Sequence, residues 1–78
     1  MSNDLAHWNY RIIRHTTNKN IRYAIHEVFY SDAMAKAVAI EESFPMGETV
    51  KELREDLQLM LKAFNHPPLD MDEFEKAK

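Results

Sequence analysis

The 78-residue sequence contains no cysteine, a single glycine and no long apolar run. The absence of cysteine excludes disulfides and zinc sites built from cysteine thiolates. No apolar stretch approaches the roughly 18 residues that a membrane-spanning helix needs. Residues 1–8 have neither a basic segment nor an apolar core, so we expect no signal peptide and a cytoplasmic protein.

A chain of this length can form one domain with one small core. We expect a single domain over 1–78, with the core in 8–64, a C-terminal arm in 65–74 and frayed ends at 1–6 and 75–78. The net charge of −3 is unevenly distributed, because residues up to 26 carry +3 and the remainder carries −6. Such asymmetry can steer a charged partner toward one part of the surface.

Alternating apolar and polar residues predict three β-strands. The first covers 8–15, and the polar segment 16–20 that follows has a length suited to a hairpin loop. The second covers 21–30, where Glu27 interrupts the apolar side and predicts a bulge or a strong twist. A shorter third strand is expected at 37–42.

The helix signal is the strongest in the chain. Thr49 and Glu52 form a capping box, in which the threonine oxygen accepts from a backbone N–H and the glutamate reaches back. One apolar stripe then recurs at helical spacing, formed by Val50, Leu53, Leu57, Met60, Leu61 and Phe64. Pro67 and Pro68 forbid continuation, so the predicted helix covers about 50–64. Gly47, just before it, permits a positive φ.

These elements predict an α+β fold with two layers, a three-stranded antiparallel β-meander packed against one long C-terminal α-helix, in the order β-β-β-α. The expected core is Trp8, Tyr10, Ile12, Tyr23, Ile25, Val38, Ile40, Leu53, Leu57, Met60 and Leu61. No second helix is expected to cover the other face of the sheet. Solvent, the C-terminal arm or another molecule must therefore meet that face.

We hypothesise that this uncovered face binds a protein partner or a second copy of the chain, forming a homodimer. The residues expected to make the contact are Arg11, Ile13, His15, Arg22, His26 and Tyr30. Plain solvent exposure is one alternative. Binding of RNA or single-stranded nucleic acid by the basic hairpin is another, since arginine meets phosphates and aromatic rings stack on bases.

The sequence predicts no enzyme and no cofactor. His26-Glu27 resembles the start of a zinc-protease motif, but that motif needs a second histidine four residues on, where Tyr30 stands. His15 and His26 on neighbouring strands could bind a metal with one carboxylate. We favour the interpretation that these histidines are two polar side chains on a solvated face. Neither a metal site nor a catalytic residue is therefore predicted.

The order of three strands followed by Gly47-Glu48-Thr49-Val50-Lys51-Glu52-Leu53 resembles the antitoxin-like domain of the HicB family, over about 8–64. Phe44-Pro45-Met46-Gly47 departs from the Pro-Gly-Cys-like segment usual there. The chain also resembles a group of small uncharacterised bacterial proteins in its Trp-Asn-Tyr-Arg start at 8–11 and its Tyr-Ala-Ile-His-Glu-Val strand at 23–28. The HicB resemblance implies a compact β-β-β-α domain that binds a protein partner.

Overall fold

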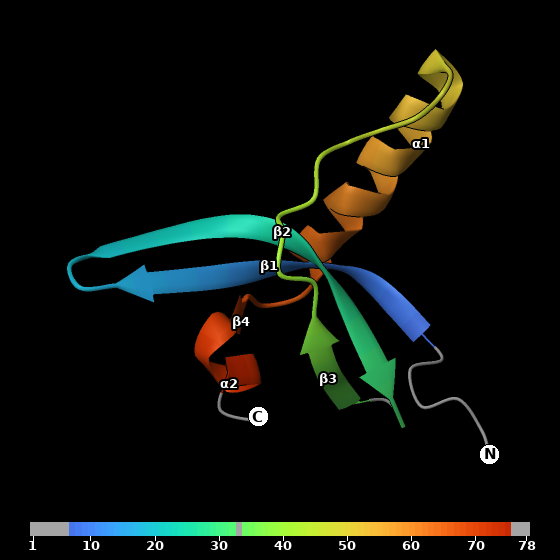
Figure 1. The fold of residues 1–78 in the computed structure, drawn as a ribbon. Helices are drawn as coiled ribbons and strands as arrows, with labels where there is room; N and C mark the ends of the chain where they lie inside the picture. The colour runs from blue at the N-terminus through green and yellow to red at the C-terminus, as the bar shows by residue number, and fades with distance from the viewer. Residues whose placement is uncertain (1–6, 33, 76–78) are drawn as a thin grey trace.

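The computed structural model describes residues 7–32 and 34–75, which form an α+β fold. Four strands make one mixed sheet, in the order β3-β2-β1-β4, that curls into a half-barrel (Figure 1). The strands are β1 (His7–Thr17), β2 (Asn20–Ser31), β3 (Met34–Val38) and β4 (Leu69–Asp70). The helices are α1 (Val50–Leu61), the 3-10 helix η1 (Lys62–Asn65) and α2 (Met71–Glu75). The segments 1–6 and 76–78, predicted to be frayed, lie outside the described residues.

The predicted three-stranded antiparallel meander under one long C-terminal helix is therefore wrong. The fourth strand, β4, pairs in parallel with β1, placing Leu69 beside Ile13 and Asp70 beside Arg14. The Pro67-Pro68 pair ends the helical segment, as predicted, but the chain then returns to the sheet. A salt bridge of 3.1 Å between Arg14 and Asp70 accompanies this return. The C-terminal arm thus becomes part of the fold.

Helix α1 meets the sheet only near its C-terminal end and projects away from it toward its N-terminus (Figure 1). The helix is shorter than predicted, because η1 replaces its last turn. The capping prediction is confirmed at Thr49, whose Oγ1 accepts from the Glu52 N–H at 3.1 Å. The Glu52 carboxylate accepts instead from the Glu48 N–H at 2.9 Å. Gly47 does not adopt a positive φ, and a Cβ at this position would clash with the backbone nitrogen of Leu53.

The β1–β2 hairpin is longer and its turn tighter than predicted. Thr17 still pairs with Asn20, so the turn contains only Asn18 and Lys19, and Asn18 has a φ of 21°. The expected irregularity in β2 lies at Phe29/Tyr30, where the pairing with β3 changes register. The third strand, predicted at 37–42, begins at Met34 instead and ends at Val38.

Burial is the largest difference from the predicted core. On the face expected to be open, Ile13, Val28 and His26 are fully buried. On the expected core face, only Tyr10 and Met60 are buried, together with Ala63, while Ile12 and Ile25 pack partly against them. Val38 is half-buried. The expected core residues that are exposed are Trp8, Tyr23, Ile40, Leu53, Leu57 and Leu61.

The described helices include none that combines the length and the apolar character needed to span a membrane.

Candidate functional site

The sheet face predicted to bind a partner is covered in large part within the chain itself, although Arg22 stays exposed and His15 and Tyr30 are half-buried. Helix α2 contacts β1 and β3, and β4 pairs along β1. Arg11 donates to the Tyr30 hydroxyl at 3.0 Å and to the Pro67 carbonyl at 2.9 Å. Ile13 and His26 have no exposed surface. The expectation of an uncovered face is therefore wrong, and these two side chains cannot touch a partner in this conformation.

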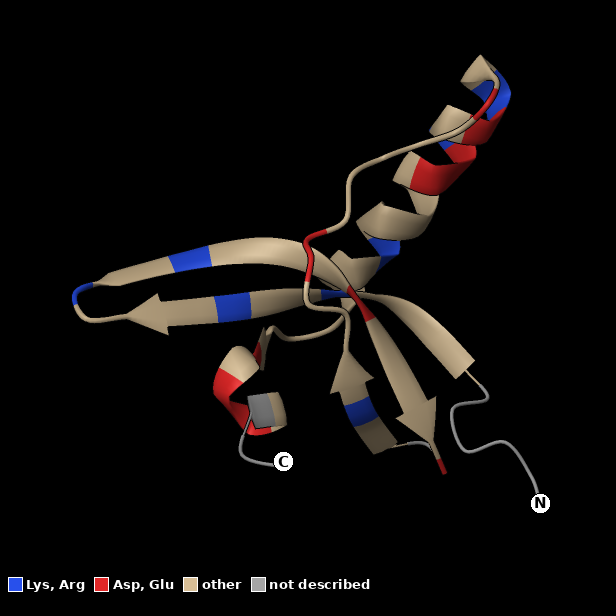
Figure 2. Cartoon of the chain, viewed as in Figure 1, with Lys and Arg blue, Asp and Glu red and all other residues tan. Residues whose placement is uncertain are grey.

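Basic side chains of the hairpin are also engaged by acidic groups of the same chain. Figure 2 shows Lys and Arg on the β1–β2 hairpin, with Asp and Glu concentrated on α1, α2 and the connection before α1. Arg14 donates to Asp70, and this hydrogen bond raises the pKa of the guanidinium. Arg22 pairs with Glu42 at 2.5 Å, and the hydrogen bond from Arg22 lowers the pKa of Glu42. These pairings reduce the positive charge offered to a phosphate backbone.

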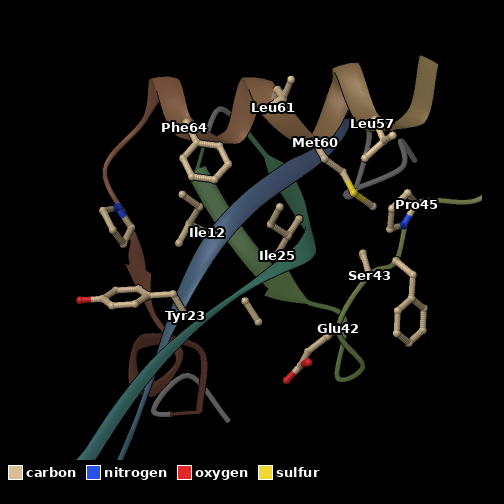
Figure 3. A pocket seen from close by; sticks show the side chains of 13 residues that line it. Ile12, Tyr23, Ile25, Glu42, Ser43, Pro45, Leu57, Met60, Leu61 and Phe64 are labelled. Atoms are coloured by element: carbon tan, nitrogen blue, oxygen red, sulfur yellow. The ribbon is translucent and has the colours of Figure 1, made fainter. Parts of the chain in front are cut away.

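The opposite face holds an apolar groove of about 710 Å³ between α1, the sheet and the connection before α1. Ile12, Tyr23 and Ile25 form its floor, and Pro45 lies at its side. Phe44 also lines the groove. Figure 3 shows Met60 and Phe64 pointing from the helical segment toward Ile12 and Ile25. The remaining lining residues are Ala24, Glu42, Ser43, Leu57, Leu61 and Pro68. The groove is therefore a continuous apolar surface with few polar groups.

The helical side of this groove carries a regular stripe. Val50, Leu53, Leu57, Met60 and Phe64 are separated alternately by three and four residues. That alternation is the a/d spacing with which two helices pack side by side. Met60 is buried against the sheet, whereas Val50 is 77% exposed and Phe64 is 64% exposed. Leu53 and Leu57 are 37% and 44% exposed, so the described part of the chain leaves most of the stripe partly or largely uncovered.

Asp56 connects α1 to the rest of the fold. Its Oδ1 accepts from the Tyr10 hydroxyl at 2.7 Å, and its Oδ2 accepts from the Met46 N–H at 2.9 Å. Burial of Tyr10, followed by this hydrogen bond and the nearby negative charge of Asp56, raises the pKa of the phenol to about 12. The bond fixes the direction in which the helix leaves the sheet.

A second cluster lies where β1, β2 and the segment after β3 meet. The Nε2 atoms of His15 and His26 are 2.9 Å apart, and Glu42 contributes a carboxylate close to both. His26 is buried, with its Nδ1 2.8 Å from the Ala39 carbonyl oxygen. Two of the predicted contact residues, His15 and His26, are thus brought together on neighbouring strands.

Comparison with known proteins found no family model, curated protein or solved structure that matches this chain. The resemblance to the HicB family stays a prediction.

Sequence reasoning missed the groove because it assigned the same apolar residues to a closed core. A signal was present in the helical stripe, whose alternating spacing continues beyond what one small sheet can cover. Phe44 and Pro45 gave no periodic signal, because they lie in an irregular connection. Glu42 was assigned to a strand, and its approach to His15 and His26 depends on the path of the chain after β3.

Proposed function

We propose that this chain is a non-enzymatic protein-interaction module whose partner is a second copy of itself. The observation that carries the proposal is the apolar groove, in which the chain's own fold leaves Tyr23, Phe44 and Phe64 largely exposed. The proposed contact surface is this groove rather than the sheet face that carries Arg11 and Ile13. The opposite face of the hairpin, which carries charged side chains, packs against other parts of the same chain.

The stability of α1 supports a partner in the groove. A helix of 12 residues is marginal in water unless its apolar face is packed. The N-terminal half of α1 is held by the cap at Thr49 and by hydrogen bonds of Glu52 and Asp56. Covering the apolar stripe would supply the packing that this half of the helix lacks.

A second copy suits this surface because each chain offers both an apolar groove and an apolar helical stripe. In a twofold dimer the same patch appears on both subunits, so the stripe of one copy can lie along the stripe and groove of the other. The a/d spacing of the stripe suits contact with another helix of the same spacing. Self-association therefore needs no other surface of the molecule.

The exposed area is also large enough. Tyr23 is 57% exposed, Phe44 is 69% exposed and Phe64 is 64% exposed. With whole side-chain areas of about 150–250 Å², these three aromatic residues alone offer roughly 400 Å². A standard interface takes about 800 Å² from each partner, so the three supply about half of it.

The mass of the full chain in solution tests the proposal directly. Light scattering coupled to size-exclusion chromatography is expected to give twice the chain mass of 9.2 kDa. Phe64→Glu places a charge on the exposed stripe and is expected to give single chains. Leu59→Glu is the matched control, because Leu59 is 47% exposed on α1 but lies in a different hollow, beside Trp8.

A wild-type chain that remains a monomer up to millimolar concentration would contradict self-association. If such a monomer binds another protein and the Phe64→Glu variant does not, the interaction surface stands and the identity of the partner is wrong. If Leu59→Glu dissociates the dimer as completely as Phe64→Glu, the dimer uses another surface.

A further inference from the structure

We propose that His15, His26 and Glu42 form a binding site for a divalent transition-metal ion of the zinc class. The three side chains come from β1, from β2 and from the segment after β3. One ligand atom from each lies within 4.8 Å of the others. Two imidazoles with one carboxylate suit zinc and its neighbours, whereas magnesium and calcium prefer sites made of oxygen atoms.

The backbone holds the third ligand in place. The Ala39 N–H donates to the Glu27 carbonyl at 2.9 Å, and the Ser43 N–H donates to the Ile25 carbonyl at 2.8 Å. These two hydrogen bonds hold the segment 39–43 alongside β2. Glu42 is consequently fixed at the level of His26 although no regular strand contains it.

His26 is oriented as a metal ligand. The Ala39 carbonyl oxygen can only accept a hydrogen bond, so the Nδ1 atom of His26 carries the proton that it donates. In the neutral ring, Nε2 then presents its lone pair toward His15 and Glu42. Histidines that bind metals are commonly oriented by this kind of bond to a backbone carbonyl.

The separation of the two rings fits a shared ion. Two zinc–nitrogen bonds of about 2.0–2.1 Å that meet at about 90–109° place their nitrogens roughly 2.9–3.4 Å apart. The Nε2 atoms of His15 and His26 are already 2.9 Å apart, with one ring donating to the other. An ion can therefore replace the proton between the rings if the separation of the two nitrogens changes by at most about 0.5 Å.

Arg22 competes with the ion for Glu42, because the two side chains form a surface ion pair. Such exposed pairs are weak, so an ion held by two imidazoles can displace the guanidinium. With three protein ligands, a tetrahedral ion retains one position for water or another small ligand. Removing Arg22 should therefore strengthen binding at this site, whereas it would not affect adventitious binding to surface histidines.

The untagged full chain should be titrated with Zn²⁺ by calorimetry and with Co²⁺ by visible absorption, which reports tetrahedral coordination. We expect one ion per chain, whether the chain is single or paired. Glu42→Gln and His15→Ala should each weaken binding by at least about tenfold, as loss of a metal's supporting contacts does. Circular dichroism confirms that each variant is folded.

Arg22→Ala should bind Zn²⁺ more tightly than the wild type, because it removes the competitor for the carboxylate. His66→Ala should bind as the wild type does, because His66 is exposed and lies outside the cluster. The proposal is overturned if the wild type shows no saturable uptake, if Glu42→Gln and His15→Ala bind as tightly as the wild type, or if His66→Ala weakens binding equally. None of these results alters the oligomeric state, so the proposed function is tested separately.

Discussion

Replacement of Leu61 by alanine tests the dimer through a magnitude that the structure supplies. A fully buried leucine loses about 2.4 kcal/mol on truncation to alanine, at about 0.8 kcal/mol for each carbon removed. Leu61 is 63% exposed in the single chain, so about 1.5 kcal/mol of this depends on covering by a partner. A twofold interface contains two copies of the residue. The free energy of dissociation should therefore fall by about 3 kcal/mol, and the dissociation constant should rise roughly hundredfold.

Sedimentation equilibrium over a range of concentrations measures this constant for the wild type and the variant. Alanine has the highest helix propensity, so α1 itself should not be weakened. Leu59→Ala makes the same chemical change in the same helix, at a position that does not line the groove. Its dissociation constant should stay within about threefold of the wild type. Equal dissociation constants for Leu61→Ala and the wild type would refute the assignment of the groove.

Three further predictions concern the single chain. Ile13→Ala should lower the free energy of unfolding in urea by about 2–5 kcal/mol, since Ile13 is fully buried; Ile21→Ala, at a 58% exposed position, should cost less than about 1 kcal/mol. Thr49→Ala should cost about 0.5–2 kcal/mol and reduce helical circular dichroism, because it removes the N-cap bond to Glu52. The pKa of Tyr10 is higher in the folded chain than in the unfolded chain. Its contribution to stability is therefore complete below pH 10 and is lost as the pH rises through about 12. Absorbance of tyrosinate should show this late titration, and Tyr10→Phe should remove it.

Each of these has a contrary outcome. Equal costs for Ile13→Ala and Ile21→Ala would contradict the placement of the core on this face. An unchanged helical signal in Thr49→Ala would mean that the helix does not depend on its cap. Titration of Tyr10 near pH 10 would contradict both its burial and its hydrogen bond to Asp56.

The sequence could predict those strands and helix ends that are specified by residues close to them in the chain. The hairpin follows from apolar alternation on both sides of a short polar turn, and β1 and β2 differ from the predicted strands by at most two residues at either end. The start of α1 at Val50 follows from the capping residues Thr49 and Glu52. Pro67 and Pro68 mark the end of the helical segment. Each of these signals acts within a few residues of the chain.

The choice of the buried face could not be predicted in this way. Both faces of the hairpin carry large apolar residues, for example Ile12 on one and Ile13 on the other, so alternation alone does not say which is covered. The C-terminal arm decides it, through contacts such as that of Arg14 with Asp70, 56 residues away. A short arm with two prolines has no periodicity from which such a pairing can be read.

The sequence by itself therefore determined the hairpin, the beginning of the helix and the stripe of apolar residues along it, because hydrogen bonds and side-chain spacing within one segment specify them. Tertiary structure alone decided that Ile13 and Val28 are inside, that the groove beside α1 stays open, and that His15, His26 and Glu42 meet. The reason is that these features depend on pairings between distant segments, which no local pattern of residues specifies.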